Sequence, residues 1–149
     1  MKRVTRYTPA ELEQILQPLR ASLRALREGV ATELQWGVLC TAVTVAQAIE
    51  RQGVVRGLQE HLASAERALE AIKHRAMEAG AWAAVPLHLQ EIDVLDELVD
   101  LHTYQLRQLS AAEVANATRA AGNLARQAGG RVITIDDREW ARQTQGALL

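Results

Sequence analysis

The sequence predicts an all-α protein, an antiparallel bundle of about five helices around a buried central helix, and three observations support this fold class. The segment 32–53 is apolar on nearly every side, whereas a helix at a protein surface carries one apolar stripe. Apolar residues recur at helical spacing on both sides of this segment. Capping boxes and glycines divide the chain into stretches of helix length. A central helix wrapped by amphipathic helices is therefore the expected arrangement.

The first expected helix begins at Thr8, because Thr8-Pro9-Ala10-Glu11 forms a capping box with proline at the first helical position. Leucines and Ile15 at helical spacing form an apolar stripe as far as Leu26, and Gly29 ends the helix. Pro18 lies inside this stripe and lacks the amide hydrogen that would bond one turn back. We therefore expect Pro18 to kink or divide the helix.

The second expected helix is the apolar central one. It begins at Thr32, has Gln35 three residues later, and ends at Gly53. Trp36 is the largest candidate for the core, since the chain contains no Phe. One side of this helix carries only small side chains, which should allow another helix to approach closely: Gly37, Thr41, Thr44 and Ala48.

Three further helices are expected in the rest of the bundle. One covers about residues 55–79, with Gly80 beyond its end. The next has Pro86 in its first turn and continues to about Leu109. Ser110-Ala111-Ala112-Glu113 is another capping box and opens an Ala-rich helix that frays near Gln127. These elements make residues 1–128 the helical bundle domain.

The remaining residues, 129–149, are expected to form a C-terminal strand or an extended tail. Gly129-Gly130 ends the helical pattern, and Arg131 to Ile135 (RVITI) reads as a short strand, followed by a short helix near Trp140. A lone strand does not stabilise itself. Two alternatives follow: the strand pairs with that of a second copy in a homodimer, or the segment lies extended on the bundle.

Composition and motifs argue against several classes of function. The formal net charge of −1 gives no overall attraction to nucleic acids or membranes. The longest apolar stretch, 36–49, is shorter than the roughly 20 residues needed to cross a bilayer, and the N-terminus has no signal-peptide pattern. The single Cys40 lies in the apolar central helix, where burial raises a thiol pKa. No catalytic or cofactor motif is recognisable. We therefore expect a cytoplasmic protein that is not an enzyme and needs no cofactor.

The fourth expected helix carries the best candidate for a metal or small-ligand site. His88, Glu91 and His102 lie on the same side as its apolar stripe. His102 is roughly 20 Å from His88 at 1.5 Å per residue, so one metal ion would need a ligand from another helix, such as His61. The simpler interpretation is that Glu91 pairs with an Arg or His from a neighbouring helix, because an unpaired buried carboxylate is costly.

Two rows of charged side chains are candidates for binding macromolecules. An acidic row on the fourth helix has spacing i, i+3, i+4, i+7 and could dock an Arg-rich partner, or it could simply be solvated: Asp93, Asp96, Glu97 and Asp100. A basic row on the first helix, with Lys2, Arg3 and Arg6 before it, could bind phosphates: Arg20, Arg24 and Arg27. Nucleic-acid binding is the weaker alternative, because no helix-turn-helix spacing or aromatic platform accompanies this row.

The first third of the chain resembles a group of known proteins. The motifs are R-Y-T-P-A-E (residues 6–11), Q-P-L-R-A-S-L-R-A-L-R-E-G (17–29) and T-E-L-Q-W (32–36). This pattern, over about residues 5–55, is similar to short uncharacterised helical proteins of bacterial prophages and plasmids. The resemblance implies a related fold and an origin in a mobile element, and it transfers no active site.

These observations lead to one expected function and two alternatives. We expect a non-catalytic helical protein of a phage or plasmid that binds a host protein or a second copy of itself, for example as an inhibitor of a host enzyme or defence complex. The expected contact elements are the acidic row and Trp140, since an exposed Trp is a common interface anchor. The alternatives are a bundle that binds a metal or small ligand, and a nucleic-acid-binding module.

Overall fold

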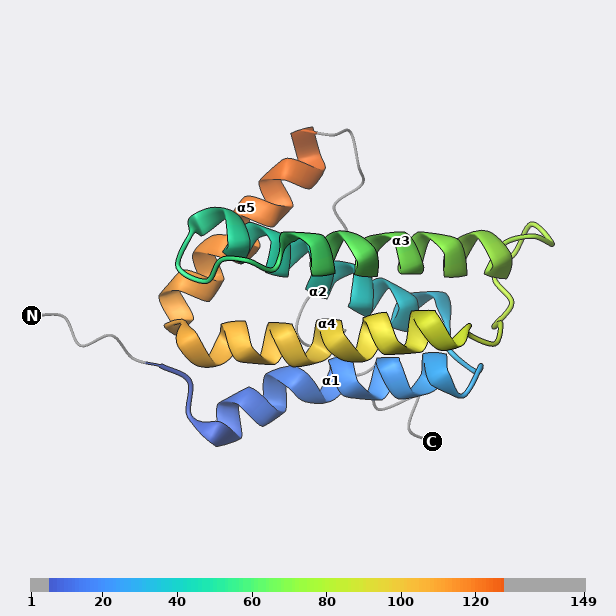
Figure 1. The fold of residues 1–149 in the computed structure, drawn as a ribbon, viewed down its shortest axis with the longest axis horizontal. Helices are drawn as coiled ribbons and strands as arrows, with labels where there is room; N and C mark the ends of the chain where they lie inside the picture. The colour runs from blue at the N-terminus through green and yellow to red at the C-terminus, as the bar shows by residue number, and fades with distance from the viewer. Residues whose placement is uncertain (1–5, 128–149) are drawn as a thin grey trace, which may run out of the picture.

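The computed structural model describes residues 6–127, with side chains as far as residue 122, and this part of the chain is all-α (Figure 1). It contains no strand; one isolated β-bridge joins Arg6 to Ser110. The prediction of an all-α bundle is therefore confirmed. Its five helices are α1 (Pro9–Arg27), α2 (Glu33–Gln52), α3 (Gln59–Ala76), α4 (Leu89–Gln108) and α5 (Ala111–Gln127).

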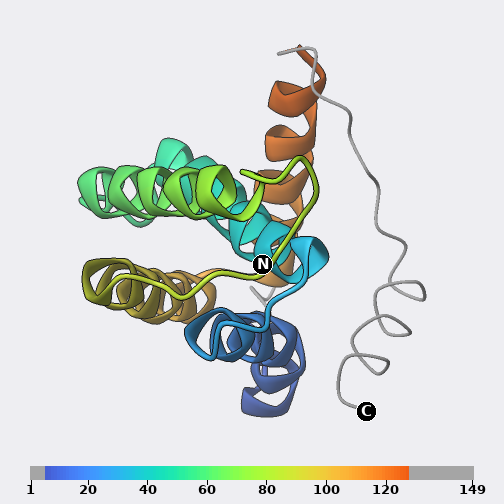
Figure 2. The ribbon, with the colours of Figure 1, turned by 90° about the vertical axis from the view of Figure 1, so that its right-hand side faces the viewer.

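The first four helices form the body of an antiparallel bundle, and α5 crosses it (Figure 1 and Figure 2). α2 packs against each of the other four helices, whereas α1 and α3 each pack mainly against α2 and α4. A helix with neighbours on so many sides needs apolar residues around most of its circumference. This arrangement accounts for the apolar composition that marks α2 in the sequence.

The core is built from the apolar stripes that face α2. Leu39 and Ala46 of α2 are fully buried among leucines of α1, α3 and α4. A second cluster joins α5 to the C-terminal half of α2 through small side chains, including Ala48, Ala117 and Ala121. The predicted close approach is thus found at Ala48. It does not extend to Gly37, where an added Cβ would meet no atom within 4 Å.

Helix boundaries follow the capping signals of the sequence in α1, α2 and α5. Thr8 with Glu11 and Thr32 with Gln35 form complete capping boxes, and Ser110 makes the same reciprocal bonds with Glu113. Gly53 ends α2 with a φ of 81°, a conformation that favours glycine. These starts and stops were all predicted to within a residue or two.

Three predicted boundaries are wrong. α3 ends at Ala76, three residues before the predicted end near residue 79. α3 begins at Gln59 instead of near residue 55, because the chain turns at Gly57 with a φ of 95°. α4 begins at Leu89, so Pro86 lies before the helix and not in its first turn. His88 is the N-cap residue, and the side chain of Glu91 accepts the backbone N–H of His88 at 2.8 Å.

Pro18 lies inside α1, which continues as one helix from Pro9 to Arg27. Of the two expected outcomes, a kink or a division, the division is not seen. The ribbon of α1 bends near its middle (Figure 1), as the lost hydrogen bond and the proline ring predict.

Trp82, in the connection between α3 and α4, packs against Trp36 of α2. Their rings lie 6.0 Å apart between centroids. The indole N–H of Trp36 donates to the carbonyl oxygen of Leu69 at 2.8 Å, and that of Trp82 donates to the carbonyl oxygen of Ala31 at 2.9 Å. Both rings are half-buried, and each indole N–H has a hydrogen-bond acceptor.

The expected strand from Arg131 to Ile135, the homodimer pairing through it, and Trp140 all lie outside the described residues. The predicted boundary between a bundle domain, 1–128, and a tail, 129–149, lies just beyond the last described residue, Gln127. Among the helices that are described, none combines the length and apolar character required to cross a membrane.

The capping box of α2 provides a first test of this fold. Replacing Thr32 with Ala leaves the backbone N–H of Gln35 without its acceptor and should cost about 1 kcal/mol of the free energy of unfolding. Thr41→Ala on the same helix is the control, because Thr41 is exposed and bonds only to a carbonyl within α2. Urea unfolding followed by circular dichroism measures both variants. Equal stability of the two would contradict the cap.

Candidate functional site

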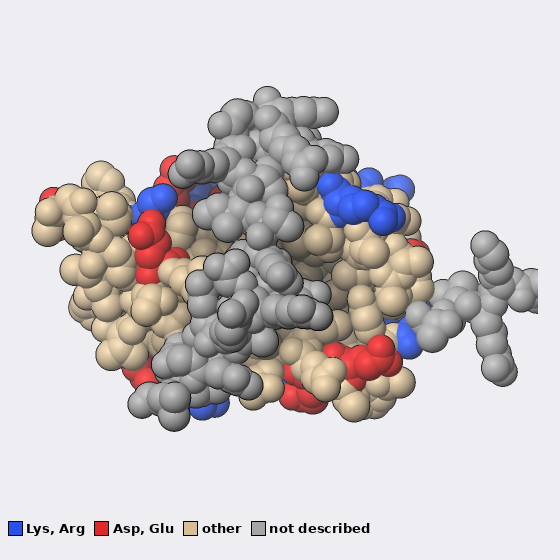
Figure 3. Space-filling view, turned by 180° about the vertical axis from the view of Figure 1, so that it is seen from behind, with Lys and Arg blue, Asp and Glu red and all other residues tan. Residues whose placement is uncertain are grey.

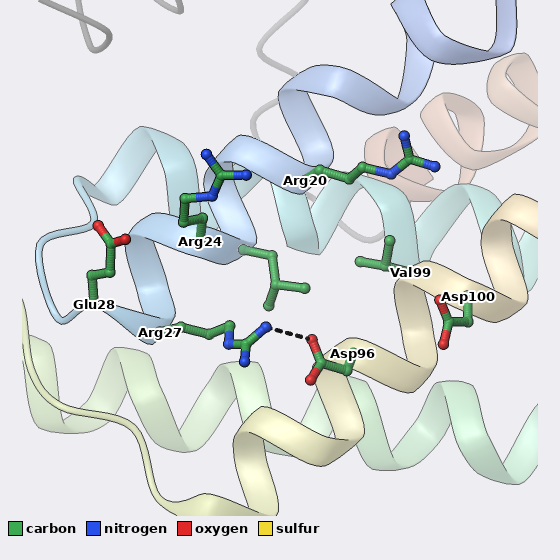
Figure 4. Close-up of a pocket in the computed structure, with 8 residues that line it drawn as sticks. Arg20, Arg24, Arg27, Glu28, Asp96, Val99 and Asp100 are labelled. Carbon is green, nitrogen blue, oxygen red and sulfur yellow. Dashed lines mark hydrogen bonds and ion pairs between the residues drawn. The ribbon is translucent and has the colours of Figure 1, made fainter.

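The predicted basic row of α1 and half of the predicted acidic row of α4 meet in one open groove between these helices, here called the charged groove (Figure 4). Its volume is about 710 Å³. The side chains that line it carry both signs of charge around an apolar floor: Arg20, Leu23, Arg24, Arg27, Glu28, Asp96, Val99 and Asp100.

The packing of the two helices explains why the rows meet. Leu23 of α1 and Val99 of α4 are buried with side-chain neighbours in the main core and form the floor of the groove. The arginines flank Leu23 on α1, and Asp96 and Asp100 flank Val99 on α4. Because both apolar stripes face inward, their polar flanks face each other at the surface.

Only part of this charge is neutralised within the protein. Arg27 lies 3.5 Å from Asp96 across the groove, and Arg20 pairs with Glu13 of its own helix at 2.7 Å. Arg24 and Asp100 are both exposed, and neither forms an ion pair with another described residue. In Figure 4, Arg20 and Arg24 point away from α4 while Arg27 points toward Asp96. Glu28, which also lines the groove, is exposed and likewise forms no ion pair among the described residues, so one cation and two anions are left to pair with another molecule.

The acidic row does not act as a single surface. Asp96 and Asp100 line the charged groove, whereas the carboxylate of Glu97 lies 2.8 Å from Nδ1 of His61 on α3. Asp93 is exposed, one turn closer to the start of α4, and is not part of the groove lining. The helical spacing that joins the four residues in the sequence therefore spans two sides of α4.

Of the predicted metal candidates, His88 and Glu91 are neighbours, with Nδ1 of His88 3.9 Å from Oε1 of Glu91, whereas His102 lies apart from them. His88 is an exposed N-cap residue, Glu91 is buried one turn later, and His102 is buried three to four turns further along α4. Within the described part of the chain, no group of three His, Cys, Asp or Glu side chains is arranged to hold a metal ion. His61, the ligand expected from another helix, pairs instead with Glu97.

Glu91 has the partner that the simpler interpretation expects. Its two carboxylate oxygens bind the two terminal nitrogens of Arg75 at 2.6 and 2.9 Å, and one oxygen also accepts the backbone N–H of His88. Burial raises the pKa of the Glu91 carboxyl, but the hydrogen bonds from Arg75 and His88 lower it by more, so its pKa lies below the ordinary value. This carboxylate joins α3 to the first turn of α4.

His102 belongs to a buried hydrogen-bonded network that links α4 to α2. Its Nδ1 lies 3.0 Å from Oε1 of Gln105, and Nε2 of Gln105 donates to the carbonyl oxygen of Ala46 at 3.1 Å. Burial lowers the pKa of His102, so the ring is neutral at pH 7. Both side chains are at least nine-tenths buried.

Cys40 is half-buried, and burial raises the pKa of its thiol to about 12. The thiol is therefore protonated at neutral pH and does not supply the thiolate that a cysteine nucleophile requires. The predicted rise in its pKa is confirmed.

Sequence reasoning missed two of these polar residues. Arg75 is one of several basic residues near the end of α3, and only the folded structure shows which one reaches Glu91. Gln105 is fully buried although it is polar. Its position three residues after His102, on the side of the apolar stripe, is the signal that could have identified it.

The buried pair of Arg75 and Glu91 gives a stability prediction. Glu91→Gln keeps the size of the side chain but leaves the guanidinium of Arg75 without its counter-ion, and should cost about 2–3 kcal/mol of the free energy of unfolding. The control is Glu97→Gln, which breaks an exposed pair with His61 and should cost less than about 1 kcal/mol. Chemical unfolding at pH 7 compares the two. A smaller loss in Glu91→Gln than in the control would refute this role.

His102 should make the free energy of unfolding depend on pH at values above those at which the carboxylates titrate. The pKa of His102 in the folded protein lies below 6.5, so as the pH falls the unfolded chain binds a proton before the folded protein does. The contribution of His102 to the free energy of unfolding therefore decreases as the pH drops below 6.5. Glu91 contributes in the same direction, but only as the pH falls below 4.5. Unfolding measured between pH 7.5 and 5.5 should therefore show a smaller loss of stability in His102→Gln than in the wild type. Identical slopes would show that His102 is not held neutral.

Comparison with protein-family models, with curated proteins and with solved structures finds no match for this chain. Its function must therefore be argued from the geometry and chemistry of the residues described above.

Proposed function

We propose that this protein is a non-catalytic helical bundle that acts by binding another protein through the charged groove. The observation that carries the proposal is the meeting of the basic row of α1 with two residues of the acidic row, Asp96 and Asp100 of α4, along one open groove. Such a surface selects a partner with both signs of charge in complementary positions, because like charges brought together repel.

The unpaired charges support this use of the groove. Arg24 and Asp100 are exposed and form no ion pair among the described residues, so a partner can engage them without breaking an existing contact. Leu23 and Val99 provide a small apolar floor between them. Charged groups at such a rim chiefly set specificity and the rate of association, and a partner must add apolar contacts of its own.

The two alternatives have less support. A phosphate backbone attracted to Arg20, Arg24 and Arg27 would also meet Asp96 and Asp100 in the same groove. On the face drawn in Figure 3, neither sign of charge forms a continuous patch across the visible coloured surface. A metal site at His88, Glu91 and His102 would require residues of which one, His102, lies apart, and which are already engaged in the cap, the Arg75 pair and the Gln105 network.

We propose in addition that the bound protein is a host enzyme or defence complex, and that the site of action is the cytoplasm. This part of the proposal rests on the resemblance of residues 5–55, noted in the sequence, to short helical proteins of bacterial prophages and plasmids. A small protein that covers a surface can inhibit without any catalytic group of its own.

The test is capture of partners from a bacterial lysate by the tagged protein, with two variants of equal net charge. Arg24→Glu with Asp100→Lys reverses one unpaired charge on each of the two helices that form the groove. Arg51→Glu with Glu70→Lys makes the same exchange at exposed residues outside the groove, on α2 and α3. We expect a partner that the wild type and the second variant retain and the first variant loses, as mass spectrometry would show.

Two results would contradict this proposal. A partner retained equally by both variants would place the contact elsewhere on the protein. Retention of the wild type on heparin at 0.15 M salt, lost in Arg24→Glu, would instead favour the nucleic-acid alternative.

A further inference from the structure

A second groove, lined by residues other than those of the charged groove, is mainly apolar, and we call it the apolar groove. Its volume is about 310 Å³, and residues of α1, α2, α4 and α5 line it, among them Ile15, Val38, Val45 and Val114. Ile15 is 42 % exposed although its side chain is large and apolar. A cavity of this size is at the lower end of the range that holds small organic molecules.

The threonines of the apolar groove offer hydrogen-bond acceptors but no donors. The described residues that line the groove include no charged side chain at neutral pH, and the polar ones are Thr41, His102 and Thr118. The hydroxyl groups of Thr41 and Thr118 donate to the carbonyl oxygens of Gly37 and Val114, each within its own helix. A hydroxyl that has donated its one hydrogen keeps a lone pair and can only accept.

His102 provides a third acceptor in the groove. Its side chain is more than nine-tenths buried. Nε2 of Gln105 donates to the carbonyl oxygen of Ala46 at 3.1 Å, so the atom of Gln105 that faces Nδ1 of His102, at 3.0 Å, is the carbonyl oxygen Oε1. Because this oxygen can only accept, Nδ1 must carry the proton of the neutral ring. Nε2 of His102 is therefore the unprotonated nitrogen and an acceptor.

This acceptor is open to the groove. Nε2 of His102 forms no hydrogen bond with a described residue. Within the described part of the chain, the one side-chain nitrogen or oxygen atom that is sealed from solvent without a partner is Oε2 of Glu50. Nε2 is therefore not sealed off, and the groove that His102 lines gives access to it. A molecule in the groove can reach this nitrogen with a hydrogen-bond donor.

The chemistry of the apolar groove specifies the class of molecule that it can hold. Burial of apolar surface against the valines and Ile15 favours a ligand with an apolar body. A ligand that carries only acceptors, or a negative charge, meets no donor on the side chains described. A ligand with several polar groups would lose its hydration without enough compensating hydrogen bonds. One donor on an apolar body matches the groove.

We propose that the apolar groove binds a small uncharged organic molecule that has an apolar body and donates one O–H or N–H to Nε2 of His102. Phenols, indoles and aliphatic alcohols belong to this class. The proposal goes beyond the function proposed for the charged groove and does not depend on it, since the two grooves share no lining residue.

The first test compares two probes of nearly the same shape that differ in one donor. Indole has an N–H group, whereas benzofuran has an oxygen atom at the same ring position and no donor. Long-range ¹H–¹⁵N NMR spectra of the full chain detect both ring nitrogens of His102, and they should show the proton on Nδ1 before a probe is added. We expect indole to shift the Nε2 signal saturably and to bind about tenfold more tightly than benzofuran, the equivalent of one hydrogen bond.

A variant without the acceptor tests the role of His102 directly. His102→Leu keeps the groove apolar and should bind indole and benzofuran with equal affinity, followed through the methyl signals of Val45 and Val114. The control is His74→Leu, at an exposed histidine of α3 outside the groove, which should keep the preference for indole. Circular dichroism checks that both variants are folded. If His102→Leu does not fold, the comparison of the two probes in the wild type still decides.

Four results would overturn the proposal. The first is the lack of a saturable shift of the His102 signals with indole, and the second is equal affinity of the wild type for indole and benzofuran. The third is a proton on Nε2 instead of Nδ1, which would leave the groove without this acceptor. The fourth is a change of the His102 signals with protein concentration alone, which would show that a second copy of the chain covers the groove.

Discussion

The packing of α2 against four other helices is the constraint on which the rest of this structure depends. An apolar helix exposed to water would be strongly unfavourable, so the chain before and after α2 must cover it on several sides. α1, α3 and α4 do so with leucine-rich stripes, and α5 does so with alanines that allow close contact. The position of each outer helix therefore follows from the side of α2 that it covers.

The same constraint determines where the polar groups lie. Because α1 and α4 both direct apolar stripes toward the core, the edges of their polar faces become neighbours at the surface. A basic edge and an acidic edge then form one groove. In the interior, the carbonyl oxygen of Ala46 on α2 accepts from Gln105, which orients His102 in turn. Surface and interior features both derive from the arrangement of the helices.

Local signals in the sequence predicted most of the fold. Thr8, Thr32 and Ser110 are ordinary N-cap residues, and each begins a helix as expected. The start of α4 was mislocated because His88 is an unusual N-cap residue and Pro86 resembles a first-turn proline. The late start of α3 depends on a left-handed turn at Gly57, which the helical spacing of the neighbouring apolar residues conceals.

The candidate site could be predicted only in part, since it depends on which helices are neighbours. The residues of both charged rows were identified from their spacing, but the spacing says nothing of whether Asp96 faces α1 or α3. The structure divides the acidic row between these two helices, with Asp96 directed to Arg27 and Glu97 to His61. Which neighbouring helix each acidic residue contacts is decided by tertiary packing, and a helical wheel drawn from the sequence does not show it.

The connection between α3 and α4 has a consequence for how the chain tolerates alteration. It is held along its length by Trp82, which binds Ala31, and at its end by Arg75, which binds Glu91 and the carbonyl oxygen of Pro86. A loop fixed in this way resists proteolytic nicking and would not accept an inserted peptide without losing these bonds. The shorter turn before α3 offers no easier place for an insertion, because Gly57 has a φ of 95° and its backbone N–H donates to the carboxylate of Glu50.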